Sequence, residues 1–169
     1  MILGGPGGDY SLVGGDGGND QIRGGQGNDA VYGQAGDDRL RGGRGRDVVV
    51  GDSGEDSVSG GPGSDDLEGI GANRGNDRVS GGQGRDFIHD GYGEDRHHGG
   101  PGPDTVGFEP PRLDERDLTL GGTGADCVWV QDGFGGDEAR GGPGRDRWQA
   151  DAGDLVMTVE VRGCPRRCS

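Results

Sequence analysis

A nine-residue repeat between Gly24 and Glu68 limits the folds that are open to this chain. Read in nines, the stretch is GGQGNDAVY, GQAGDDRLR, GGRGRDVVV, GDSGEDSVS and GGPGSDDLE. Every unit has glycine at its first and fourth places, aspartate at its sixth and an aliphatic residue at its eighth. A period of nine does not match a helix face, whose hydrophobic periods are about 3.5 to 3.67 residues. It is typical of a coil that winds a turn and a short strand again and again.

The repeat extends, with insertions, over almost the whole chain. We count about fifteen units between residues 4 and 149, and this range is the predicted repeat domain. Within residues 108–120 the glycines are lost, but removing the four residues FEPP leaves a nine-residue unit with Asp117 at its sixth place. We interpret this segment as a bulge followed by a degenerate unit. The alternative is a true boundary between two shorter rolls.

Residues 150–169 are expected to cap the stack and to form a cysteine-containing tail. The stretch LVMTVEVR alternates like an edge strand, and together with Trp148 it would close the open apolar end. Cys164 and Cys168 are close enough in sequence for a local disulfide, which would leave Cys127 as an odd thiol.

The composition argues against a conventional packed core. Hydrophobic residues make up 27% of the chain, glycine accounts for 44 residues and the net charge is −14. Such a chain is expected to be unfolded in plain buffer. A disordered acidic tail is the alternative, but disorder does not require a nine-residue register. The acidic balance argues against nucleic acid as a partner and favours cations.

Targeting signals are not evident in the sequence. No apolar run approaches the roughly 20 residues of a membrane span. The start MILGGPGG has no basic region followed by an apolar one, so no signal peptide is visible. Either export uses another signal, or this chain is a piece of a longer protein.

The spacing of the repeat also predicts how the side chains are placed. In a short strand the middle side chain faces one way and its neighbours the other, so the eighth place points inward and the seventh and ninth outward. Two units complete one coil, and units n and n+2 stack at the strand spacing of ~4.8 Å. The predicted columns are Asp29, Asp47 and Asp65 on one side, and Asp20, Asp38 and Asp56 on the other.

Columns of carboxylates at this spacing repel each other unless cations lie between them. Carboxylates together with turn carbonyls make an all-oxygen cage of about six ligands, which suits Ca²⁺. Mg²⁺ requires stricter octahedral geometry and releases its water reluctantly. Zinc would lack its usual nitrogen and sulfur ligands.

With these motifs the chain resembles the RTX, or haemolysin-type, calcium-binding nonapeptide family, whose unit is G-G-x-G-x-D-x-U-x. The resemblance covers about residues 4 to 149. It implies an all-β, right-handed parallel β-roll with several Ca²⁺ ions between successive turns. It also implies an extracellular, secreted protein that folds on Ca²⁺ after export. The departures are the inserted units, His97, the glycine-free residues 112–120 and a basic tail unlike the usual export signal.

Carried over to this sequence, the resemblance supplies two sets of metal ligands. The side-chain ligands would be the sixth-place aspartates Asp20, Asp29, Asp38, Asp47, Asp56, Asp65, Asp77, Asp86, Asp95, Asp104, Asp126, Asp137 and Asp146. The carbonyl ligands would come from the turn glycines Gly24, Gly25, Gly27, Gly42, Gly43, Gly45, Gly60, Gly61 and Gly63.

Other chemistry finds little support in the sequence. His89 and His98 are ninth-place residues of adjacent units and should lie on opposite sheets, while His97 should point inward alone. No serine or cysteine has a histidine and an acid placed around it, so we expect no enzymatic activity. The leading function is an extracellular structural module that folds on Ca²⁺. The alternatives are the secretion or folding module of a larger exoenzyme or toxin, with flanking domains, and an adhesin-like module.

Overall fold

The chain folds into a two-sided stack of parallel strands. The structure is a computed structural model, and it describes residues 1–8, 12–13, 17–68, 75–108, 116–130, 136–150, 152–157 and 161–162. Within these residues there are eighteen strands and no helix, so no helix long and apolar enough to cross a membrane occurs there. Successive strands alternate between two nine-stranded sheets, and every neighbouring pair is parallel. The predicted all-β parallel roll is confirmed.

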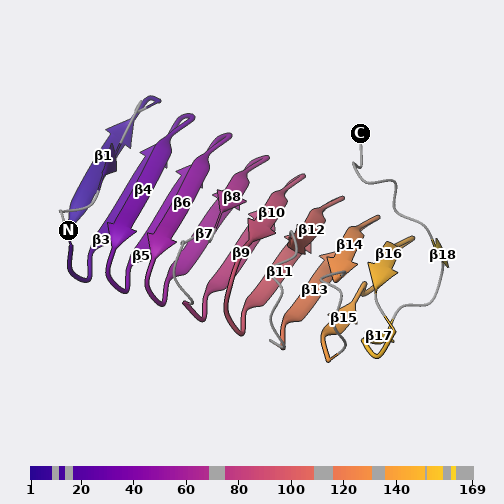
Figure 1. Cartoon of the computed structure of the whole chain (residues 1–169). Helices are drawn as coiled ribbons and strands as arrows, with labels where there is room; N and C mark the ends of the chain where they lie inside the picture. The colour runs from indigo at the N-terminus through magenta and orange to yellow at the C-terminus, as the bar shows by residue number, and fades with distance from the viewer. Residues whose placement is uncertain are drawn as a thin grey trace.

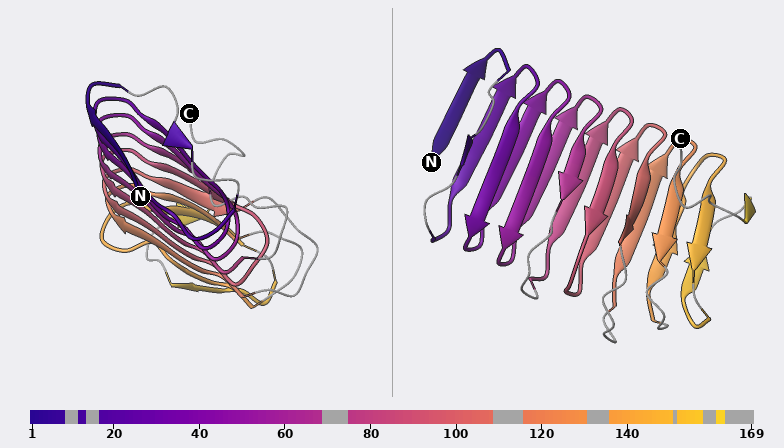
Figure 2. Two further views of the ribbon diagram at one scale, coloured as in Figure 1. Left: turned by 90° about the vertical axis from the view of Figure 1, so that its left-hand side faces the viewer. Right: turned by 45° about the horizontal axis from the view of Figure 1, so that its top comes forward.

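The odd-numbered strands form sheet A and the even-numbered strands form sheet B. Sheet A contains β1 Ile2–Pro6, β3 Gln21–Gln26, β5 Arg39–Arg44, β7 Ser57–Pro62, β9 Arg78–Gln83, β11 Arg96–Pro101, β13 Leu118–Thr123, β15 Glu138–Arg140 and β17 Leu155–Met157. Sheet B contains β2 Leu12–Val13, β4 Ala30–Ala35, β6 Val48–Ser53, β8 Asp66–Glu68, β10 Phe87–Asp90, β12 Thr105–Phe108, β14 Cys127–Val130, β16 Arg147–Ala150 and β18 Val161–Arg162. In Figures 1 and 2 the colour advances steadily along the stack, so each coil contacts the one before and the one after.

The stacking register follows the repeat. In the regular block, paired residues are two units apart, as in Ile22 with Leu40 on sheet A and Val31 with Val49 on sheet B. Inserted residues widen this interval without changing which side chains face inward. Val58, for example, pairs with Val79 across the longer unit.

The degenerate unit at residues 108–120 does not interrupt either sheet. Strand β11 pairs with β13, and β12 pairs with β14, so both sheets continue past the segment. The alternative of two separate rolls is therefore wrong. Phe108, the first of the four extra residues, ends strand β12, and residues 109–115 lie outside the described residues.

The strands are longer than the three-residue segment expected from each unit. Several run for six residues, from the seventh place of one unit through the third place of the next, so the first two glycines belong to the strand. The second glycine has a positive φ, 126° at Gly25 and 128° at Gly43, which a residue with a side chain rarely adopts. A Cβ on Gly43 would also meet the carbonyl oxygen of Gly25 in the preceding coil. Glycine thus lets the coils approach closely at this place.

The core is a thin layer of eighth-place side chains between the two sheets. The buried aliphatic members are Ile22, Val31, Leu40, Val49, Val58, Leu67, Val79, Ile88, Val106, Val128 and Ala139. In the described part, the eighth place is polar at His97 and Thr119, which are also buried and are paired in register. His97 Nδ1 lies 3.3 Å from Thr119 Oγ1. His97 therefore points inward as expected, but it is not alone.

The C-terminal segment adds one short strand to the end of each sheet. Strand β17 pairs with β15, and β18 pairs with β16. Cys127 on β14 is disulfide-bonded, so the prediction that it is the odd thiol is wrong. Sequence spacing favoured a bridge between the two nearest cysteines, whereas folding can bring together cysteines that are distant in the chain. The partner of Cys127 and the predicted bridge between Cys164 and Cys168 lie outside the described residues.

Candidate metal centre

The sixth-place aspartates stand at the two edges of the roll, where the chain passes from one sheet to the other. Each aspartate immediately precedes a strand, because the fourth-place glycine and the fifth residue complete the turn before it. The column leading into sheet B contains Asp29, Asp47, Asp65, Asp86, Asp104, Asp126 and Asp146. The column leading into sheet A contains Asp20, Asp38, Asp56, Asp77, Asp95, Asp117 and Asp137. All thirteen aspartates predicted from the sequence lie in these columns.

One oxygen of each carboxylate ties two coils together. The backbone N–H of Asp47 donates to Asp65 Oδ1 at 2.9 Å, and the N–H of Asp65 donates to Asp86 Oδ1 at 2.9 Å. The other column repeats the pattern, with the N–H of Asp38 donating to Asp56 Oδ1 at 2.8 Å. Hydrogen bonds to a charged acceptor are stronger than neutral ones, so Oδ1 helps to hold successive turns in place.

The other carboxylate oxygen is buried without a hydrogen bond at many positions. Among the described residues, Oδ2 has no hydrogen-bond partner at Asp38, Asp47, Asp56, Asp65, Asp86, Asp104 and Asp126. These side chains are at most 2% exposed. A buried, unpaired charged oxygen costs far more than one in water, so a row of them points to a missing positive partner.

A carbonyl oxygen from the next coil faces the same space as Oδ2. A Cβ built on Gly81 would lie 2.5 Å from Asp86 Oδ2 and 2.6 Å from the carbonyl oxygen of Gly99. A Cβ built on Gly24 would likewise lie 2.5 Å from Asp29 Oδ2 and 2.5 Å from the carbonyl oxygen of Gly42. Only glycine leaves this small space open, and the oxygens that line it are hard ligands. The arrangement fits a cation that prefers oxygen, such as Ca²⁺.

The remaining predicted carbonyls also line up along the stack. The second-place oxygens of Gly25, Gly43 and Gly61 face the second-place glycine of the next coil. The fourth-place oxygens of Gly27, Gly45 and Gly63 face the fourth-place glycine of the next coil. Two rows of backbone oxygen therefore accompany the column of Asp29, Asp47 and Asp65.

Burial raises the pKa of several of the column carboxylates. It raises the pKa of Asp65 and Asp104 from 3.8 to about 7, and that of Asp56 and Asp126 to about 6. The hydrogen bond from the preceding aspartate lowers each pKa in part, and neighbouring carboxylates raise it further. A cation in the column would replace the proton as the compensating charge.

The structure adds two acidic residues to those predicted. Asp117 is buried, its Oδ1 accepts the N–H of Asp95 at 2.8 Å, and it therefore occupies the column. The signal was present in the sequence, since Asp117 is the sixth residue of the degenerate unit. Asp52 stands where most units have the second glycine, and its charge adds to burial, the main cause, in raising the pKa of Asp38 and Asp56. An acid in a glycine position is the sequence signal for Asp52.

Fifth-place residues form a further ladder outside the carboxylate columns. The backbone N–H of Arg46 donates to Asn28 Oδ1 at 2.8 Å, and that of Glu94 donates to Asn76 Oδ1 at 2.9 Å. These two bonds join turns of successive coils and have neutral acceptors. They stabilise the stack without needing a metal ion.

Side chains alone do not form a compact metal cluster in the part of the chain that the structure describes. No group of three or more histidine, cysteine, aspartate or glutamate residues gathers at one point there. His89 on β10 and His98 on β11 lie on opposite sheets, as the register predicts. An ion in a column would therefore take carbonyl oxygens along with one or two carboxylates.

Comparison with known proteins gives a family match. The RTX calcium-binding nonapeptide repeat matches at residues 14–49, 42–69 and 71–106, which together cover more than half of the chain. No curated protein matches the chain.

Proposed function

Since the chain belongs to the RTX calcium-binding nonapeptide repeat family, we propose that it is a module that folds when its turn columns bind several Ca²⁺ ions. The observation that supports this most directly is the row of buried Oδ2 atoms without hydrogen-bond partners in the described columns. Several of these oxygens, at Asp38, Asp65, Asp86, Asp104 and Asp126, share their space with a carbonyl oxygen of the next coil. Flexible cages of six to eight oxygens favour Ca²⁺ over Mg²⁺, which requires strict octahedral geometry.

The ligands in this proposal are the thirteen aspartates predicted from the sequence together with Asp117. Carbonyl oxygens of the first-, second- and fourth-place glycines complete the coordination. Ions held between consecutive turns would join coil to coil, because each gap receives oxygens from both of its neighbours.

Coupling to folding follows from the balance of forces in the roll. The core contains about one buried side chain per nine residues, which is little apolar surface for a chain of 169 residues. The metal-free columns must also bury carboxylates whose pKa burial raises, as at Asp65 and Asp104. Metal binding removes the cost of burying these ionised carboxylates. The free energy of metal binding therefore contributes to the free energy of folding.

The proposed setting is extracellular. Extracellular Ca²⁺ modules have dissociation constants of roughly 10⁻⁴ to 10⁻³ M. Such a chain would therefore be unfolded at the Ca²⁺ concentration of the cytosol and would fold outside the cell. We propose a structural role without catalysis. The second candidate is a secretion or folding module attached to flanking domains of a longer secreted protein, which the repeat family also accommodates.

The test is circular dichroism during a Ca²⁺ titration, with Mg²⁺ as the control ion. We expect the strand signal to appear steeply with Ca²⁺ and not with Mg²⁺ at equal concentration. Full strand signal after chelator treatment, or an equal response to the two ions, would contradict folding on Ca²⁺. Equilibrium dialysis would give the number of bound ions independently of folding.

A further inference from the structure

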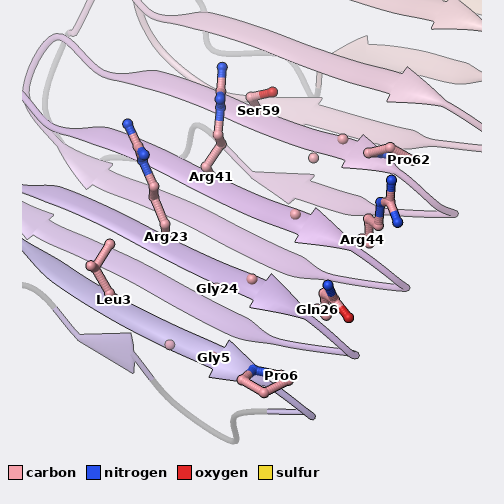
Figure 3. Close-up of a pocket in the computed structure, with 15 residues that line it drawn as sticks. Leu3, Gly5, Pro6, Arg23, Gly24, Gln26, Arg41, Arg44, Ser59 and Pro62 are labelled. Carbon is pink, nitrogen blue, oxygen red and sulfur yellow. The ribbon is translucent and has the colours of Figure 1, made fainter.

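The outer face of sheet A carries a groove that the metal columns do not use. It crosses the outer surface of β1, β3, β5 and β7 and has a volume of about 780 Å³. One wall consists of ninth-place side chains and the other of third-place side chains. The floor between them is glycine backbone, because the first and second places have no side chain. Figure 3 shows Arg23 and Arg41 on one side of this floor, and Gln26 and Arg44 on the other.

The groove is positively charged. Arg23 and Arg41 are directly paired in register on neighbouring strands, and Arg44 stands on the opposite wall beside Gln26. All three arginines are exposed, and none forms an ion pair with another described residue. No aspartate or glutamate lines the groove among the described residues, although the chain has 31 acidic residues.

The positive charge extends over the rest of this face. The seventh-place residues Arg39, Arg78 and Arg96 are also exposed on sheet A. In the described part of sheet A, Glu138 is the one acidic residue at the outward seventh and ninth places, and it forms an ion pair with Arg140. The outer face of sheet A thus presents arginine, whereas acidic residues such as Asp66 and Glu68 lie on the outer face of sheet B.

We propose that the groove binds an anionic polysaccharide, with the polymer running across strands β1 to β7. The planar guanidinium group binds carboxylate or sulfate through two parallel hydrogen bonds. Arg23 and Arg41 offer such groups at the strand spacing of ~4.8 Å, which suits a polymer with regularly placed charges. Gln26 and Ser59 supply donors and acceptors for hydroxyl groups, and the glycine floor lets a sugar ring lie against the backbone.

Other linear ligands fit the groove less well. No aromatic side chain lines it among the described residues, so it lacks the stacking platforms that single-stranded nucleic acids use. An extended peptide that adds a strand needs a free sheet edge, whereas this groove lies on a sheet face.

The test compares three polymers with the same backbone: dextran sulfate, carboxymethyl dextran and neutral dextran. Binding is measured by isothermal titration calorimetry at physiological salt, on protein whose circular dichroism spectrum shows the roll. We expect at least one of the two charged polymers to bind and neutral dextran not to bind. The polymer that binds identifies sulfate or carboxylate as the recognised group.

Two double variants separate the groove from general charge attraction. Arg23→Gln with Arg41→Gln should weaken binding at least about tenfold, since each loses a charge-assisted contact. Arg46→Gln with Arg85→Gln removes the same charge from exposed turn residues outside the groove, and should change affinity less than about twofold. Equal losses in the two double variants, binding of neutral dextran, or no binding of either charged polymer would overturn the proposal. A failure of Ca²⁺-dependent folding would be seen in the circular dichroism spectrum. It would not be seen in the ratio of each variant's affinity to that of the unaltered protein.

Discussion

Replacement of Asp65 by asparagine tests the charge of the columns with little change of shape. Asp65 lies between Asp47 and Asp86, and its Oδ1 accepts the N–H of Asp47 at 2.9 Å. Asparagine keeps that acceptor and replaces Oδ2, which has no hydrogen-bond partner among the described residues, by a neutral amide nitrogen. The Asp65→Asn variant therefore removes a negative charge and one candidate metal ligand while keeping the bond between the coils.

Asp65→Asn is expected to stabilise the roll without metal and to weaken its folding with Ca²⁺. Burial raises the pKa of Asp65 from 3.8 to about 7. At about 1.4 kcal/mol per pKa unit, the ionised carboxylate destabilises the metal-free roll at pH 8 by at most about 4 kcal/mol. Solvent screening at the turn reduces this to about 2 kcal/mol. Asp65→Asn should thus stabilise the metal-free roll by about 2 kcal/mol, and should raise the Ca²⁺ concentration at half-folding by about tenfold or more.

Two circular dichroism series at pH 8 measure these effects. The first follows strand signal in chelator as trimethylamine N-oxide is added, since this osmolyte favours compact states. The second follows strand signal against Ca²⁺. The control is Asp66→Asn, which removes the same charge from the adjacent residue on the outer face of β8. A variant of Asp65 that is destabilised in both series, or that behaves like Asp66→Asn, would refute the assignment of Oδ2 to a cation.

Three further predictions concern the backbone and the titration of the columns. Gly45→Ala should destabilise the Ca²⁺-loaded protein by at least about 2 kcal/mol in urea unfolding, because φ is 135° there and a Cβ would meet the carbonyl oxygen of Gly27. Gly5→Ala, whose Cβ would meet nothing within 4 Å, should change stability by less than about 0.5 kcal/mol, and equal effects would contradict the close stacking. Gln34→Gly should stabilise the roll by about 1 kcal/mol in the same assay, because Gln34 has a φ of 77°, whereas Gln26→Gly should not. Acidification of the metal-free protein from pH 8 to pH 5 should increase its strand signal. The folded-state pKa values of about 6 to 7 exceed the unfolded value of 3.8, so the roll binds more protons in this window and gains stability as the pH falls. Loss of signal on acidification would show that the carboxylates are not buried as described.

Much of the fold could be predicted because the constraints are local and repeat. Side chains alternate along a strand with a period of two, so a fixed unit length always turns the eighth residue inward. Stacking two units later then follows, and the structure pairs Leu40 with Val58 as this rule requires. The residues inserted between Val58 and Val79 do not change the pairing of eighth-place side chains, since these two residues are still partners in the sheet.

Features that depend on distant partners could not be predicted in the same way. His97 meets Thr119 across an interval widened by the inserted residues, and the repeat contains no information about which polar residues stack. The disulfide of Cys127 joins it to a cysteine far away in the sequence, and a local repeat does not specify such a pairing. The left-handed conformation of Gln34 arises because the coil imposes the glycine geometry even where glycine is absent.

The different tasks of the two oxygens of one carboxylate explain why the columns should respond to metal as a unit. Oδ1 accepts a hydrogen bond from the preceding coil, and Oδ2 faces oxygen from the following coil, so each aspartate contacts both neighbours. In a linear array of this kind, stability is the sum of the coils and of the interfaces between them, and ordering one interface favours the next. The weakest interfaces should be those that the insertions widen, such as Ser57 with Arg78 and Arg96 with Leu118 on sheet A, because ordering the longer loop opposes closure of the coil. Ca²⁺ binding should therefore begin in the regular block from Gly24 to Glu68 and extend outward from it, with hydrogen exchange slowest in β4, β5 and β6.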